Sequence, residues 1–64
     1  MDIKITLAAA RKNKNYSQKE AGEKIGVSLS TIKNWERGYT SPKASHVGKI
    51  CEVYELPYDA IFFG

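Results

Sequence analysis

The sequence predicts an all-α domain built from short helices, and three observations carry that prediction. Ser17 and Glu20 stand at the spacing of a capping box, in which each side chain accepts a backbone hydrogen bond from the other residue. Gly26 and Gly38 each follow an amphipathic stretch directly, where a left-handed residue without a Cβ ends a helix at little cost. A chain of 64 residues is also close to the smallest size that folds on a hydrophobic core alone, and compact helices suit that size.

The segment 17–38 reads as two short helices joined by a tight turn. The first helix starts after Ser17, and its buried face carries Ala21 and Ile25. The second helix is capped by Ser28. Apolar residues recur along it at three-residue steps, at Leu29, Ile32 and Trp35. Gly22, inside the first of these helices, costs about 1 kcal/mol relative to alanine, and we expect it to permit a close helix approach.

The second helix of this pair has a polar face opposite its buried one. At about 100° per residue, that face holds Ser30, Lys33, Asn34 and Arg37, which we expect to point to solvent. Cations mixed with short hydrogen-bonding groups suit a DNA major groove, where base edges lie between two rows of phosphates. An ordinary solvated helix carries a similar face, so the face alone leaves both readings open.

The remaining elements are predicted from apolar spacing and turn residues. A first helix is expected from about Ile3 to Lys14, with Ile3, Leu7 and Ala10 buried. After Gly38, Ser41 suits an N-cap and Pro42 a first helical position. They predict the start of a fourth helix, whose buried stripe is expected at Val47, Ile50, Cys51 and Tyr54. A last short helix is expected from Pro57 to Phe63.

Composition excludes several classes of function. Cys51 is the single cysteine and His46 the single histidine, so neither a disulfide within the chain nor a metal cluster is expected. No group of bases, nucleophiles or metal ligands suggests an enzyme, and no cofactor is implied. No apolar run is long enough for a membrane span and the N-terminus lacks a secretion signal, so we expect a cytoplasmic protein.

Charge is distributed unevenly along the chain. Residues 1–43 hold nine Lys or Arg against four acids, a net +5, whereas residues 44–64 hold one Lys against three acids, a net −2. The predicted helix pair lies in the basic part. Attraction to phosphates requires that arrangement, although other proteins also show it.

These motifs carry a resemblance to a known family. Ser17-Gln18, Ile25 to Ser28, Thr31-Ile32 and Trp35 to Gly38 resemble the helix-turn-helix of lambdoid phage repressors and Cro, also called the xenobiotic-response-element type. Further similarities extend over nearly the whole chain, 1–64, which we therefore expect to be one DNA-binding domain. The resemblance implies a compact, five-helix, lambda-repressor-like fold with the helix-turn-helix at helices 2 and 3.

The resemblance also implies residue roles. Base contacts are implied for Ser28, Leu29, Ser30, Lys33 and Asn34. Phosphate contacts are implied for Gln18, Thr31, Arg37, Thr40 and Lys43. Arg11 and Glu36 are implied to form a largely buried salt bridge that orients helices. Leu29 departs from the polar pattern of these residues because its side chain is apolar. It can complete the core or press against a thymine methyl group.

The family's function is regulation of transcription through an operator in double-stranded DNA. One small domain makes few base contacts, so we expect a homodimer, formed in solution or only on DNA, and a palindromic operator. A Cro-like or repressor-type phage or prophage protein is the favoured reading. The alternative is an antitoxin or other protein-interaction module with the same fold. Glu55 and Pro57 depart from the family's usual glycine and serine. We expect either that Ile61 and Phe62 close the core while Tyr58 and Phe63 stay partly exposed, or that the exposed remainder of this aromatic segment forms a dimer contact.

Overall fold

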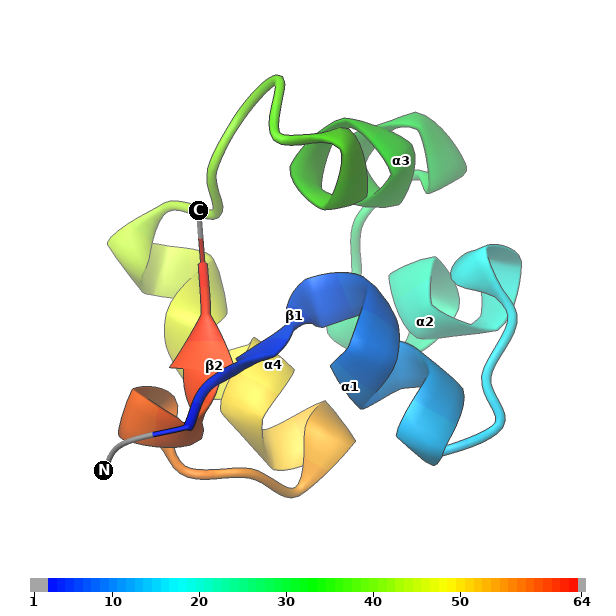
Figure 1. The fold of residues 1–64 in the computed structure, drawn as a ribbon. Helices are drawn as coiled ribbons and strands as arrows, with labels where there is room; N and C mark the ends of the chain where they lie inside the picture. Colours follow the sequence, from blue (N-terminus) through cyan, green and yellow to red (C-terminus); the bar gives the residue numbers. More distant parts are fainter. Residues whose placement is uncertain (1–2, 64) are drawn as a thin grey trace.

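The computed structural model describes residues 3–63, and it is mostly helical (Figure 1). Met1, Asp2 and Gly64, which the expected domain 1–64 includes, lie outside the described residues. The elements in chain order are β1 (Ile5–Thr6), α1 (Leu7–Asn13), α2 (Gln18–Ile25), α3 (Leu29–Arg37), α4 (Ala44–Tyr54), a 3-10 turn (Tyr58–Ala60) and β2 (Ile61–Phe62). None of the described helices is long and apolar enough to cross a membrane.

The helices surround one hydrophobic core. In Figure 1, α3 lies along one end of the molecule with α2 beside it, and β1 and β2 lie side by side at the opposite end from α2. Buried side chains come from all four helices and from β2. Ile32, Ile50 and Ile61 are the largest fully buried ones. The core therefore holds α3 against the body of the protein through its inner face.

The ends of α2 and α3 are formed as the sequence predicts. The Ser17 hydroxyl accepts the Glu20 N–H at 3.0 Å, and the Glu20 carboxylate accepts the Ser17 N–H at 2.9 Å. These bonds favour the charged carboxylate and lower the pKa of Glu20. Gly26 and Gly38 follow the two helices with φ of +94° and +80°. Two short helices with a tight turn between them are thus confirmed.

The first helix is shorter than predicted. It begins at Leu7 because the Thr6 hydroxyl accepts the Ala9 N–H at 3.1 Å and so caps the helix there. Ile5 and Thr6 are extended and pair with Ile61 and Phe62 as a parallel strand pair. Placing Ile3 in the buried stripe was wrong, since it is 77% exposed.

The predicted fifth helix is absent from residues 3–63. Pro57 is extended, a single 3-10 turn follows it, and the chain then forms β2. Alternate side chains of a strand point to opposite faces, so Ile61 enters the core at 1% exposure, as expected, while Phe62 stays 57% exposed, and placing Phe62 in the core was wrong. The backbone of β2 is satisfied by β1. The fold is therefore an all-α helix-turn-helix domain with four helices, not five.

Both ends of α4 also differ from the expected pattern. The N-cap is Lys43, which makes no side-chain capping bond, so Ser41 and Pro42 precede the helix instead of opening it. Of the predicted stripe, Ile50 and Tyr54 are buried, whereas Val47 and Cys51 are only partly buried. Glu55 ends α4 with a φ of +54°, a conformation that usually selects glycine. The carboxylate of Glu55 forms an ion pair with Lys14 at the end of α1.

Candidate nucleic-acid interface

Helix α3 has a firmly packed inner face. Ile32 is 1% exposed and Trp35 8%. The helix begins at Ser28, whose hydroxyl accepts the Thr31 N–H at 3.1 Å, and it ends at Gly38, whose N–H bonds back to the carbonyl groups of α3. Fixed ends and a buried stripe together set which side of α3 is presented outward.

The outward side of α3 is more varied than the sequence predicts. Ser30 and Arg37 are exposed, as expected, but Lys33 and Asn34 are partly buried, so the expectation that all four point freely to solvent was wrong. Helix α3 packs against α2, and the chain after Gly38 folds back so that the Tyr39 N–H donates to the Asn34 carbonyl at 3.0 Å. Leu29 is 41% exposed at the first position of the helix.

Two hydroxyl groups on the first turn of α3 are already hydrogen-bonded to each other. Ser28 Oγ and Thr31 Oγ1 lie 2.9 Å apart, in addition to the backbone bond that Ser28 accepts. A hydroxyl group has one donor and two acceptor positions, so these bonds leave Ser28 one further hydrogen bond and Thr31 two. Neither side chain is therefore a freely rotating contact, and Ser28 serves first as a helix cap.

A buried polar network joins α1, α2 and α3. Arg11 Nε donates to Glu36 Oε2 at 2.7 Å, and Arg11 Nη2 donates to Glu36 Oε1 at 3.1 Å. Gln18 Nε2 donates to the same Oε1 at 3.1 Å, and Arg11 Nη1 donates to the Tyr16 carbonyl at 2.9 Å. The side chains of Arg11 and Glu36 are 11% and 8% exposed, and the hydrogen bond to the Glu36 carboxylate raises the pKa of Arg11.

The network changes the charge that α3 presents. Glu36 is the only acidic residue in α3, and Arg11 neutralises it away from solvent. The two cations of the helix, Lys33 and Arg37, have no such partner among residues 3–63. The outer side of α3 therefore carries positive charge without a facing carboxylate.

The segment after α3 adds exposed groups to the same end of the molecule (Figure 1). Thr40 and Lys43 are exposed, whereas Gln18, at the start of α2, is partly buried and already bonded to Glu36. Sequence patterns do not single out Tyr39, yet its ring is 72% exposed between Gly38 and Thr40. The one feature of the sequence that could have indicated Tyr39 is the presence of an aromatic residue inside a turn.

His46 is held close to this segment. Its ring centroid lies 5.5 Å from that of Trp35, and its Nδ1 is buried without a hydrogen-bond partner in the described part of the chain. His46 is thus partly buried, because the first turn of α4 packs toward α3. Residues 3–63 contain no group of three or more side chains suited to hold a metal ion.

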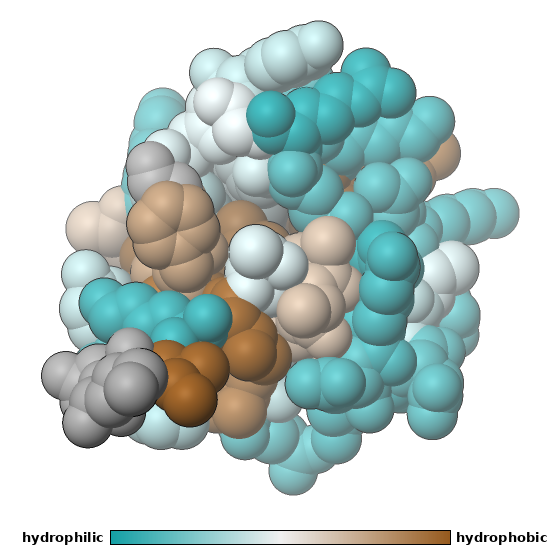
Figure 2. Space-filling model, in the orientation of Figure 1, coloured by the Kyte–Doolittle hydropathy of each residue, from teal (hydrophilic) through white to brown (hydrophobic). Residues whose placement is uncertain are grey.

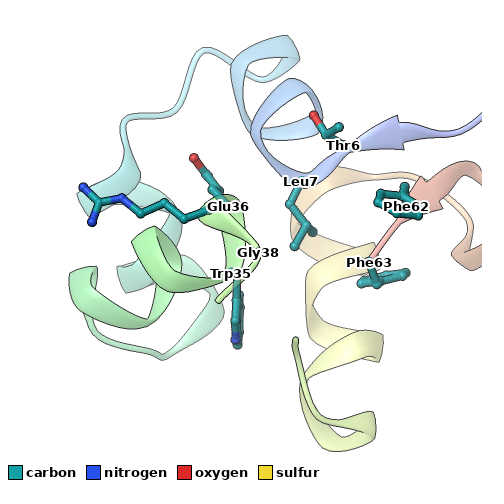
Figure 3. Close-up of a pocket in the computed structure, with 8 residues that line it drawn as sticks. Thr6, Leu7, Trp35, Glu36, Gly38, Phe62 and Phe63 are labelled. Atoms are coloured by element: carbon teal, nitrogen blue, oxygen red, sulfur yellow. The ribbon is translucent and has the colours of Figure 1, made fainter. Parts of the chain in front are cut away.

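Hydrophobic and hydrophilic surfaces are separated on the face drawn in Figure 2. Hydrophilic residues cover the regions of α3 and α2, whereas hydrophobic residues gather over β1 and β2. A cavity of about 150 Å³ lies where the two regions meet, between the end of α3 and the strand pair. Figure 3 shows Trp35 and Gly38 on one side of it and Leu7, Phe62 and Phe63 on the other.

Comparison with known proteins adds the family. The family model described as helix-turn-helix matches residues 7–61, which include the Ser28-capped helix and the network that orients it. The chain belongs to the repressor- and Cro-type helix-turn-helix family. This confirms the resemblance carried by the sequence motifs. No solved structure matches the chain significantly.

Two curated relatives of this helix-turn-helix chain carry regulatory names. It is 32% identical over 59 residues to the HTH-type transcriptional regulator ImmR of Bacillus subtilis, covering 92% of this chain and 46% of that protein. It is 34% identical over 61 residues to the cryptic phage CTXphi transcriptional repressor RstR of Vibrio cholerae, covering 95% of this chain and 54% of that protein. The chain thus spans about half the length of these relatives.

Proposed function

We propose that this chain is a transcriptional regulator, of repressor or Cro type, that binds double-stranded DNA with α3 in the major groove. The observation that carries the proposal is the orientation of α3: Ile32 and Trp35 are buried while the opposite side carries cations and small polar groups. Family membership and the names of the two relatives support it. The major groove admits a helix of this kind and presents a distinct pattern for each base pair.

The residues facing the bases are proposed to be those on the first turns of α3. Ser30 is exposed at the start of the helix, and Asn34 lies one turn further. The side chain of Asn34 takes part in none of the side-chain hydrogen bonds found among residues 3–63, so its amide is left to pair with an adenine edge. Lys33 adds a cation beside Asn34. The Ser28 hydroxyl can offer a base only the hydrogen bond that it does not already make with Thr31.

The phosphate contacts are proposed to flank the groove. Arg37, Thr40 and Lys43 are exposed after the middle of α3, and such contacts set register without reading sequence. With Ser28 as donor in the hydroxyl pair, the Thr31 proton remains for a phosphate oxygen. Gln18 uses one amide hydrogen on Glu36 and has a second for the backbone of the DNA.

Selection of bound fragments from a random duplex pool at near-physiological salt tests the proposal. We expect a consensus, and binding to it that weakens steeply as salt rises. Asn34→Ala is expected to cost about 1–3 kcal/mol on the consensus and to relax one or two positions of it. An equal loss on consensus and random duplexes would remove Asn34 from the base-reading set.

Lys43→Ala is the matched comparison. It is expected to weaken binding to all duplexes alike and to lower the salt slope by about one. An unchanged slope would show that Lys43 neutralises no phosphate. A protein that enriches no duplex at all, even at low salt, would overturn the proposed function.

Two copies of the chain are proposed to bind a palindromic operator, with half-sites about 34 Å apart. Large hydrophobic side chains lie exposed near the strand pair, at Ile3, Tyr58 and Phe62, with exposures of 77%, 65% and 57%. The rings of Tyr58 and Phe63 stack at 5.4 Å, beside a groove lined also by Pro42, Ala44 and Val47. Contact between copies would cover this hydrophobic surface.

Sedimentation with and without the selected duplex tests the dimer. We expect two chains per palindromic duplex, and a loss of the second chain with Phe62→Ser. As a control, Glu52→Ala changes neither the hydrophobic surface nor a proposed DNA contact and should keep two chains bound. One chain per duplex in the unsubstituted protein would contradict the dimer.

A further inference from the structure

We propose that Leu29 reads the methyl group of a thymine, so that the preferred half-site carries a T·A pair opposite the first turn of α3. The inference rests on the proposed function, which places α3 in the major groove, and it assigns one position of the DNA. The two roles that the sequence leaves open for Leu29 were completion of the core and contact with DNA. The structure distinguishes between them.

Leu29 contributes little to the core. Its side chain is 41% exposed, and it belongs neither to the buried cluster nor to the partly buried hydrophobic residues that pack against that cluster. The inner side of α3 is already filled by Ile32 and Trp35. Leu29 is therefore an exposed hydrophobic side chain at the very start of the helix, outside the buried core.

The neighbours of Leu29 define what it can recognise. Ser28 is occupied as the cap and by Thr31, so it competes little for the same base edge. Ser30, next in sequence, is exposed and offers a hydroxyl that bonds to either a donor or an acceptor. The first turn of α3 carries no acidic residue that would favour a cytosine amino group.

Among the four base pairs, only A·T and T·A present a methyl group in the major groove. A leucine side chain gains by removing that methyl from water, and it can offer no hydrogen bond to the polar edges of guanine or cytosine. An apolar group beside a hydroxyl thus matches the methyl and O4 of a thymine. The same chemistry disfavours a G·C pair, whose polar groups would face the leucine unpaired.

The test compares thymine with deoxyuridine, which differs only by the missing methyl group. Each thymine of the selected consensus duplex is replaced in turn by deoxyuridine, and the affinity of the unsubstituted chain is measured. Loss of one buried methyl group is expected to weaken binding about fourfold at one position of each half-site. Leu29→Ala is expected to bind the thymine duplex about tenfold more weakly and to show a thymine-to-uracil ratio near one.

Two further variants separate this contact from general effects on the helix. Leu29→Met keeps an apolar side chain and should retain much of the thymine preference. Glu52→Ala changes an exposed residue of α4 outside the proposed DNA contacts and should leave the ratio near four. Because Leu29 is exposed, Leu29→Ala should unfold at nearly the same temperature as the unsubstituted chain.

The outcomes distinguish the two proposals. A consensus without thymine, no thymine whose methyl matters, or a ratio unchanged in Leu29→Ala would each overturn the role of Leu29 while leaving DNA binding intact. A chain that enriches no duplex would overturn both. A fourfold ratio that disappears only with Leu29→Ala would establish the contact.

Discussion

Removal of the Glu36 carboxylate is expected to be among the most damaging single changes in the protein. The two carboxylate oxygens accept three hydrogen bonds, two from Arg11 and one from Gln18, at 2.7–3.1 Å. Glu36→Ala leaves the guanidinium of Arg11, itself only 11% exposed, without its counter-charge. Breaking one partner of a buried pair costs about 3–5 kcal/mol.

That loss is large for a domain of this size. At about 0.05–0.15 kcal/mol per residue, a chain of 64 residues has an unfolding free energy of about 3–10 kcal/mol. Urea unfolding followed by far-ultraviolet circular dichroism and by Trp35 fluorescence should therefore show a greatly lowered midpoint, or no folded baseline. The exposed pair of Lys49 and Glu52, 3.6 Å apart, provides the control. Glu52→Ala should cost less than about 1 kcal/mol.

A double substitution separates the ion pair from general damage to the fold. Arg11→Met with Glu36→Met removes both charges and fills part of the space with apolar atoms, so we expect it to lose less stability than Glu36→Ala alone. The network then acts chiefly to orient α3 and not to stabilise the fold. A loss under about 1 kcal/mol for Glu36→Ala, or strictly additive single losses from Arg11→Met and Glu36→Met, would refute this reasoning.

The other predictions concern close packing and titration. A Cβ on Gly22 would lie 2.8 Å from the Val27 carbonyl oxygen, so Gly22→Ala should destabilise the fold by about 1 kcal/mol in urea unfolding. Helix propensity alone predicts a gain in stability of similar size. A stabilised variant would show that the turn at Val27 moves to make room for the methyl group. Burial raises the pKa of Tyr54 to about 12 and so favours its neutral form in the fold. The neutral Tyr54 side chain contributes about 3 kcal/mol to the free energy of unfolding below pH 10, and this contribution is lost as pH rises toward 12, because the unfolded chain ionises first. Tyr54→Phe should therefore flatten the alkaline decline in the free energy of unfolding. An unchanged decline would contradict this prediction. The hydrogen bond from Lys14 lowers the pKa of Glu55, so the stability that it adds is present above the ordinary value of 4.5 and lost as pH falls through the lowered one. Glu55→Gln should reduce the acid dependence of the unfolding midpoint, and identical acid profiles would exclude this contribution.

Local interactions explain which features could be predicted from the sequence. The capping box of Ser17, the cap at Ser28 and the left-handed residues Gly26 and Gly38 all act within four residues of the chain. These interactions join residues that are close in sequence, so the bounds of α2 and α3 could be predicted from residue types and their spacing. The burial of Ile32 and Trp35, and with it the outward direction of α3, followed from helical spacing.

Interactions between distant segments explain what the sequence could not predict. Ile61 pairs with Ile5 from the other end of the chain, and that pairing replaces a predicted helix with a strand whose alternation buries Ile61 and exposes Phe62. Periodicity in so short a segment cannot choose between the two. Sequence spacing is equally silent on the bond from Gln18 to Glu36, because it joins the start of α2 to the end of α3.

Local residue types determined where the two helices of the helix-turn-helix begin and end and which side of α3 faces inward. Only the tertiary structure decided how far each outer side chain is exposed: Lys33 and Asn34 are partly covered, while Leu29 is left at the surface. The physical reason is that exposure depends on every element packed around a residue. A helix period gives a direction but not the neighbours that occupy it.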